Sequence, residues 1–149
     1  YILFYKMEVL IMADTDRYRK QHQTILEDAE KISSFLTVEK VKENSGDIRV
    51  TLSNLMGKLK VHLAMEDKSL YPRLLEHDSE QIKNTAIMFI SEMGKIGETV
   101  EKYNEKWSNK TVIQKAPDVF IDETKGILKA LEARIEKENK ELYGLIDAI

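Results

Sequence analysis

The chain of 149 residues contains no cysteine. This absence excludes disulfide bonds, thiolate metal sites and thiol nucleophiles together. Only two prolines and six glycines interrupt the chain, and helix-forming residues dominate the rest. Basic residues form no block apart from acidic ones, and the net charge is −3. We therefore expect no nucleic acid among the partners of this protein.

Histidine is scarce as well. The chain has three histidines, at positions 22, 62 and 77, and the second half has none. A metal site that relies on imidazoles from both halves is therefore incomplete. The sequence also lacks a nucleophile–base pair and a phosphate-binding loop, so an enzyme of another class is not the expected function.

Residues 1–13 precede the first regular helical pattern and are unusually apolar. They are too few to span a bilayer, and they lack the basic start and the cleavage site of a signal peptide. We predict an N-terminal arm or extension that docks on the body of the protein or on a partner. An arm that faces a membrane surface is the alternative. No membrane span is expected, and a cytoplasmic location is the default prediction.

Residues 14–149 have the size and composition of one globular domain, with 42% apolar and 33% charged residues in the whole chain. Apolar residues recur with a period near 3.6, which is typical of amphipathic helices. Four long helices are expected, at about 14–36, 52–76, 82–107 and from 118 onward. The connections are short and no segment resembles a strand. The prediction is an all-α fold, an antiparallel up-down-up-down four-helix bundle.

Local signals refine the predicted helix ends. Asp78 is the expected N-cap of the third helix, with Gln81 three residues later. Asp118 is the expected cap of the fourth helix, after a connection over residues 108–117. Pro72 is expected to kink the second helix without ending it.

Polar side chains interrupt three of the four apolar stripes, and such residues build the sites in bundle cores. His22 interrupts the first stripe, His62 and Glu66 the second, and Glu138 the fourth, with Arg134 one turn earlier. The third helix places no histidine or carboxylate inward, because Glu92 falls beside its stripe.

The two histidines in these stripes are expected at similar depth. In two antiparallel helices, residues at equal distances from the connection lie side by side. His22 and His62 are both twenty residues from residue 42, which lies in the first connection. His77 lies fifteen residues beyond His62, about 22 Å along a helix. We therefore expect His77 at a helix end or on the surface, outside the site.

Two segments resemble the hemerythrin-like, or HHE cation-binding, family. They are Arg19-Lys-Gln-His22-Gln and the run from His62 through Glu66 to Leu70-Tyr71-Pro72. The resemblance implies a four-helix bundle with a non-haem di-iron centre. It also implies a histidine in helix one, His-x-x-x-Glu in helix two, a histidine in helix three and a second His-x-x-x-Glu/Asp in helix four.

The second half departs from this pattern. Residues 134–144 align with residues 62–72, so that Glu138 matches Glu66 and Tyr143 matches Tyr71. An internal repeat is therefore plausible. However, Arg134 stands where the fourth helix of the family has its histidine. The histidine of helix three would fall near residues 89–93, where this chain has none.

Arg134 governs the expected metal chemistry. A guanidinium offers no lone pair and stays charged, so it cannot bind a metal. At about 4 Å it opposes an incoming cation by a few kcal/mol at an effective dielectric constant of ~20. Our leading hypothesis is that Arg134 replaces the metal in a buried network with Glu66 and Glu138, supported by His22 and His62.

Two other interpretations remain open. The residues His22, His62, Glu66 and Glu138 could hold one divalent ion, Fe²⁺ or Zn²⁺, with water completing the coordination. A di-iron centre is possible by family resemblance, but it needs ligands that the motifs do not supply.

The expected function follows from the incomplete site. We predict a hemerythrin-like domain that acts as a regulatory or interaction module, with an unknown protein partner and an undetermined oligomeric state. The alternative is a sensor or storage protein that binds non-haem iron or another divalent metal and responds to O₂, NO or iron. Dioxygen carriage is not expected, because it needs two irons to share a two-electron change.

Overall fold

The computed structural model describes the backbone of residues 2–148 and the side chains of residues 2 and 15–148. Within this part of the chain every regular element is a helix and no strand occurs. The predicted all-α class is confirmed. No helix among these residues combines the length and apolar character that crossing a membrane requires.

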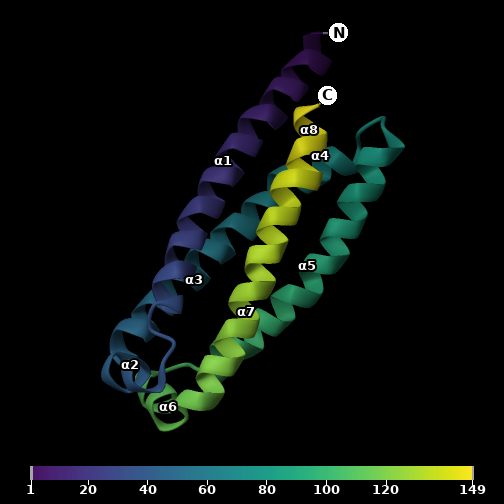
Figure 1. Ribbon diagram of the computed structural model, residues 1–149. Coiled ribbons are helices and arrows are strands. Elements are labelled where there is room, and N and C mark those ends of the chain that lie inside the picture. Colours follow the sequence, from purple (N-terminus) through teal and green to yellow (C-terminus); the bar gives the residue numbers. More distant parts are fainter. Residues whose placement is uncertain (1, 149) are drawn as a thin grey trace.

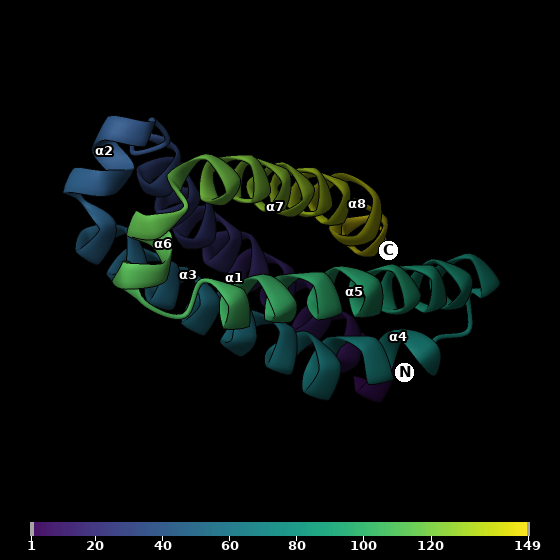
Figure 2. The same cartoon turned by 90° about the horizontal axis from the view of Figure 1, so that it is seen from below.

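Four long helices are joined by short helical connections. The long helices are α1 (Ile2–Ser33), α3 (Ser45–Met65), α5 (Glu80–Lys106) and α7 (Pro117–Lys137). The connections and extensions are α2 (Val38–Glu43), α4 (Tyr71–Leu75), α6 (Lys110–Lys115) and α8 (Tyr143–Asp147), with π-helical turns η1 (Glu66–Leu70) and η2 (Glu138–Leu142). Helices α2 and α6 lie at one end of the molecule, and α4 and α8 lie at the other end (Figures 1 and 2).

The first helix begins earlier than expected. Helix α1 starts at Ile2, so the backbone of residues 2–13 continues the helix that was predicted from about residue 14. The side chains of residues 3–14 and the whole of Tyr1 lie outside the described residues. The docking of an N-terminal arm therefore stays a prediction.

Two predicted helix starts are off by one residue or more. Ser79, not Asp78, caps α5, and its hydroxyl accepts a hydrogen bond from the Ile82 N–H at 3.4 Å. Helix α7 begins at Pro117, so Asp118 lies inside its first turn. The connections that were expected to be irregular contain α2 and α6. These helices have six residues each, too few for a periodic pattern to be read.

The buried apolar residues form two clusters. The larger one fills the half of the molecule near α2 and α6 and includes Trp107, whose Nε1 donates to Glu123 at 2.6 Å. The smaller one lies near α4 and α8 and includes Leu70, Phe89 and Tyr143. A hydrogen-bonded polar cluster adjoins these apolar residues.

Two large apolar side chains on α5 lie outside the core. Ile90 is 38% exposed and Met88 is 41% exposed. The actual inward stripe of α5 passes through Ala86, Phe89 and Met93. Ile90 and Met88 flank that stripe on either side of Phe89.

Two helices carry the same irregularity 72 residues apart. The Tyr71 N–H bonds to the Glu66 carbonyl, and the Tyr143 N–H bonds to the Glu138 carbonyl, each five residues back. Such a wide turn keeps a residue and its fifth successor on one helix face, so each glutamate shares a buried face with a tyrosine.

The π-turns also bear on two predictions. Pro72 follows η1, but Gly144 occupies the same place after η2, so proline is not the common cause of the turns. The extra residue in η2 shifts the inward positions beyond it by one. Ile146 is therefore buried, whereas Leu145, which an unbroken period of 3.6 residues would place inward, is only partly buried.

Candidate metal centre

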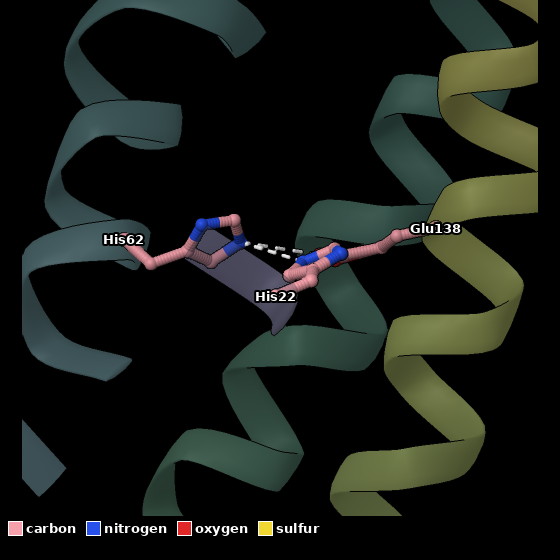
Figure 3. Close-up of side chains that lie close together, drawn as sticks. All are labelled: His22, His62 and Glu138. Atoms are coloured by element: carbon pink, nitrogen blue, oxygen red, sulfur yellow. Dashed lines mark hydrogen bonds and ion pairs between the residues drawn. The ribbon is translucent and has the colours of Figure 1, made fainter. Parts of the chain in front are cut away.

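Three helices bring together residues that are far apart in the sequence. His22 lies in the middle of α1, His62 in the last turn of α3, and Glu138 opens η2. All three are buried, and their ligand atoms lie within 4.8 Å of one another. Figure 3 shows the His62 ring meeting the His22 ring and Glu138 from the opposite side.

The contacts within this cluster converge on a few atoms. The Nε2 atoms of His22 and His62 are 3.0 Å apart. The Oε1 atom of Glu138 lies 3.4 Å from the first and 3.6 Å from the second. Glu66 joins from η1, with its Oε1 3.0 Å from His62 Nε2. This distance is that of an ion pair, but Glu66 Oε1 accepts no hydrogen bond and is buried.

Two side-chain amides orient the imidazoles. His22 Nδ1 lies 2.8 Å from Asn139 Oδ1, and His62 Nδ1 lies 2.7 Å from Gln21 Oε1. The amide nitrogen of Gln21 is directed to the Met65 sulfur at 3.0 Å, which leaves its oxygen facing the ring. Because an amide oxygen can only accept, each Nδ1 carries a proton. Both Nε2 atoms are therefore directed into the cluster.

The imidazole nitrogens and the carboxylate oxygens thus form a buried cluster, and its carboxylates need a positive charge beside them. Without a metal, a proton on His62 supplies this charge. Burial lowers the pKa of His62, but Glu138 and Glu66 outweigh burial and raise it to about 9. For Glu138, burial opposes ionisation, yet His22, His62 and Arg134 lower its pKa to about 2. Burial dominates at Glu66, and the pKa of this carboxyl is raised.

Arg134 neutralises the other side of Glu138. Its Nε donates to Glu138 Oε2 at 3.3 Å, so the two oxygens of this carboxylate face different cationic groups. The guanidinium also donates to the Phe89 carbonyl at 2.8 Å and to the Tyr71 hydroxyl at 3.4 Å. No ion pair among the described residues joins it to Glu66. The predicted direct Glu66–Arg134 contact is therefore not formed.

Glu66 and Arg134 each bind a tyrosine hydroxyl instead. The Tyr143 hydroxyl donates to Glu66 Oε2 at 2.8 Å, and the Tyr71 hydroxyl accepts from Arg134. Burial, followed by nearby carboxylates, raises the pKa of both phenols, so they stay neutral. Both hydroxyls reach the site because the π-turns place each tyrosine on the face of its glutamate.

Phe89 and Arg134 contact each other. Phe89 lies in the segment where the resemblance places the histidine of helix three, and Arg134 stands at the histidine position of helix four. The Arg134 guanidinium carbon lies 4.5 Å from the centre of the Phe89 ring, within the range of a cation–π interaction. A phenyl ring and a guanidinium thus lie together beside Glu138.

The other acidic and imidazole candidates lie outside the cluster. Glu92 stays at its edge, 41% exposed, and pairs with Lys137 at 2.8 Å and Arg134 at 3.4 Å. His77 follows α4 at a helix end, as expected. It is only 8% exposed, so the surface alternative is wrong, and its Nδ1 accepts from the Ser79 N–H at 3.0 Å.

Sequence reasoning missed the residues around the ligands. Gln21 adjoins His22 in the sequence but orients His62, and Asn139 adjoins Glu138 but orients His22. Their adjacency to candidate ligands was a usable signal. Which ring each amide reaches depends on the packing of three helices, which the period of apolar residues does not encode.

The donor set fits a metal ion. Two imidazole nitrogens and carboxylate oxygens suit Fe²⁺, Mn²⁺ or Zn²⁺. Oriented Nδ1–H groups are the usual outer support of metal-bound histidines. The buried Glu66 Oε1, which accepts no hydrogen bond and pairs with His62 Nε2 at 3.0 Å, is a further carboxylate oxygen at the same point. His22, His62 and Glu138 could therefore hold one ion, with Glu66 beside them.

The fold and the site together define an all-helical domain whose core gathers imidazoles and carboxylates that could hold a metal ion. The family model for the hemerythrin HHE cation-binding domain matches residues 13–146. The chain belongs to this family, and the resemblance read from its motifs is confirmed. No curated protein and no solved structure gives a significant match.

Proposed function

We propose that this hemerythrin-like protein is an up-down-up-down bundle that binds one divalent metal ion in a half-site. His22, His62 and Glu138 would hold the ion, and Glu66 would complete the protein ligands. Arg134 would occupy the second metal position. The observation that carries this proposal is the convergence of two oriented Nε2 atoms and two carboxylate oxygens at one buried point.

A single ion supports a regulatory role better than dioxygen transport. Reversible O₂ carriage in a di-iron centre divides two electrons between two metals, and Arg134 and Phe89 fill the second half here. A bound Fe²⁺ would supply affinity for small ligands such as O₂ or NO. The chain's own residues would orient the imidazoles, keep water out and balance the charge of the carboxylates.

Metal stoichiometry tests the proposal. The full chain, loaded with Fe²⁺ without oxygen or with Zn²⁺ or Mn²⁺, is expected to retain one ion per chain in elemental analysis and isothermal titration calorimetry. His62→Gln should abolish retention, because it removes one of the two imidazoles. Two tightly held ions per chain would contradict the half-site.

A pair of substitutions tests the role of the second half. Combining Phe89→His with Arg134→His should raise the stoichiometry above one, since it removes the fixed positive charge and restores two imidazoles. The matched control is Lys137→His, a cation on the same helix that pairs with Glu92 and is 31% exposed. It should leave one ion bound.

A metal-free interaction module is the second candidate. It is favoured by the charge balance of the cluster, where a proton on His62 and the Arg134 guanidinium already face the two carboxylates. This reading predicts no retained metal and no change in thermal stability on adding any of the three ions.

A further inference from the structure

The outer face of α5 carries apolar side chains that the described chain covers only in part. Ile87 is 56% exposed and Ile90 is 38% exposed, with Met88 beside them at 41%. Helix α5 forms one edge of the molecule (Figure 1). Large exposed apolar side chains gathered within one turn of a helix mark an interaction surface.

This face continues into two glycines. Ile87, Ile90, Gly94 and Gly97 are spaced by three, four and three residues, the spacing of a helix–helix seam. The buried stripe of α5 uses different residues. Glycine is among the poorest helix formers, and a Cβ at either glycine would meet no atom within 4 Å. Packing inside the described chain therefore does not require these glycines.

Charged residues flank the seam with opposite signs. Lys83 lies one turn before Ile87, and Glu101 lies one turn after Gly97, both on the line of the seam. If two copies of α5 pack antiparallel, Ile87 of one copy meets Gly97 of the other and Ile90 meets Gly94. Lys83 of each copy then meets Glu101 of the other. In this register each isoleucine faces a glycine and each lysine faces a glutamate, and every such contact occurs twice in the pair of helices.

We infer that the protein forms a two-fold symmetric homodimer through this face of α5. Each isoleucine fills the space above a glycine of the second copy, and two symmetric Lys83–Glu101 pairs fix the antiparallel orientation. A two-fold interface is self-complementary, which this seam satisfies without any further partner. The inference is independent of the metal proposal, because none of the seam residues belongs to the candidate metal centre.

The oligomeric state of the full chain is the first test. Sedimentation analysis over a concentration series should show a monomer–dimer equilibrium. Ile87→Glu should weaken dimerisation by at least about tenfold, because it buries a charge opposite a glycine. The matched control is Val61→Glu on α3, where the valine is 58% exposed and remote from the seam in sequence. A monomer at all concentrations, or equal effects of both variants, would overturn the inference.

Charge reversal tests the orientation. Lys83→Glu should weaken the dimer, and adding Glu101→Lys in the same chain should restore it, since each inverted pair is again complementary. Failure of the second substitution to restore the dimer would reject the antiparallel register. Circular dichroism of each variant shows whether it is folded.

The absence of cysteine allows a direct test of register. Chains with Ile87→Cys, mixed with chains with Gly97→Cys, should form a mixed disulfide under mild oxidation. Neither variant alone should crosslink efficiently, because like positions lie about 15 Å apart along the seam at 1.5 Å per residue. Rapid crosslinking of Ile87→Cys with itself would indicate a parallel contact and overturn the proposed dimer.

Discussion

Glu138 shows how single residues divide the site into two halves. One of its oxygens faces the two imidazoles and the other accepts from Arg134. One oxygen of Glu138 thus faces a point that could take a metal ion, and the other oxygen faces the Arg134 guanidinium. The proposed binding of one ion in a half-site rests on this division of the Glu138 carboxylate.

Replacing the guanidinium tests how much this charge stabilises the fold. Arg134→Ala should lower the free energy of unfolding by about 3 kcal/mol or more, because Glu138 loses a buried counter-charge. Urea denaturation of the metal-free protein measures this difference. Lys140→Ala is the control, since Lys140 pairs with Glu136 at the surface. An unchanged midpoint for Arg134→Ala would show that the buried pair contributes little.

The pKa of His62 makes stability depend on pH. Its folded pKa of about 9 exceeds its ordinary value of 6.5, so the folded state holds this proton more tightly than the unfolded state. The stabilisation is complete below pH 6.5 and is lost as the pH rises toward 9. The metal-free protein should lose up to about 3 kcal/mol over this interval.

Denaturation at a series of pH values measures that loss. In His62→Gln the decline between pH 6.5 and 9 should be largely absent, because the titrating ring is gone. A decline of equal size in this variant would assign the pH dependence to other groups.

At the residue level, helical periodicity predicted where the candidate ligands lie, and their role as ligands stays a prediction. His22, His62 and Glu138 interrupt apolar stripes, and the structure brings them together at one depth. The amides and the tyrosine hydroxyls around them depend on side-chain rotamers and on helix rotation. No pattern along one helix fixes those quantities, so the partners of these side chains emerged only with the structure.

Among the elements, the paired π-turns are the least expected feature. The repeat between residues 62–72 and 134–144 is visible in the sequence. The sequence does not show, however, that each copy contains a π-turn with an additional residue. Helical periodicity assumes 3.6 residues per turn, so it places Leu145 inward where Ile146 is buried. The short helices α2 and α6 escaped detection for a different reason, since each spans fewer than two turns.

Proline 72 offers a test of what causes these turns. Because η2 forms with Gly144 in the equivalent place, Pro72→Ala should keep η1 and change the free energy of unfolding by less than about 1 kcal/mol. A crystal structure of the variant and urea denaturation check both expectations. Loss of the Tyr71–Arg134 hydrogen bond, with a large destabilisation, would show that proline is required.

At the scale of the whole molecule, the candidate metal centre lies beside the smaller apolar cluster, and the larger apolar cluster fills the half near α2 and α6. An ion that binds only the folded chain must stabilise all of it by linkage. At a hundredfold excess over the dissociation constant this amounts to about 2.7 kcal/mol, or roughly 5–10 °C in melting temperature for a domain of this size. Differential scanning calorimetry with and without Zn²⁺ measures the shift, and Glu138→Gln should reduce it.

The position of the single tryptophan has a practical consequence. Trp107 is buried in the larger core cluster, whereas Tyr18, Tyr71 and Tyr143 belong to the smaller cluster beside the imidazoles. The fluorescence of Trp107 will therefore report on packing in the larger core cluster and respond weakly to changes at the candidate metal centre. Loading of the cation site is better observed through the ultraviolet absorption of the phenol rings.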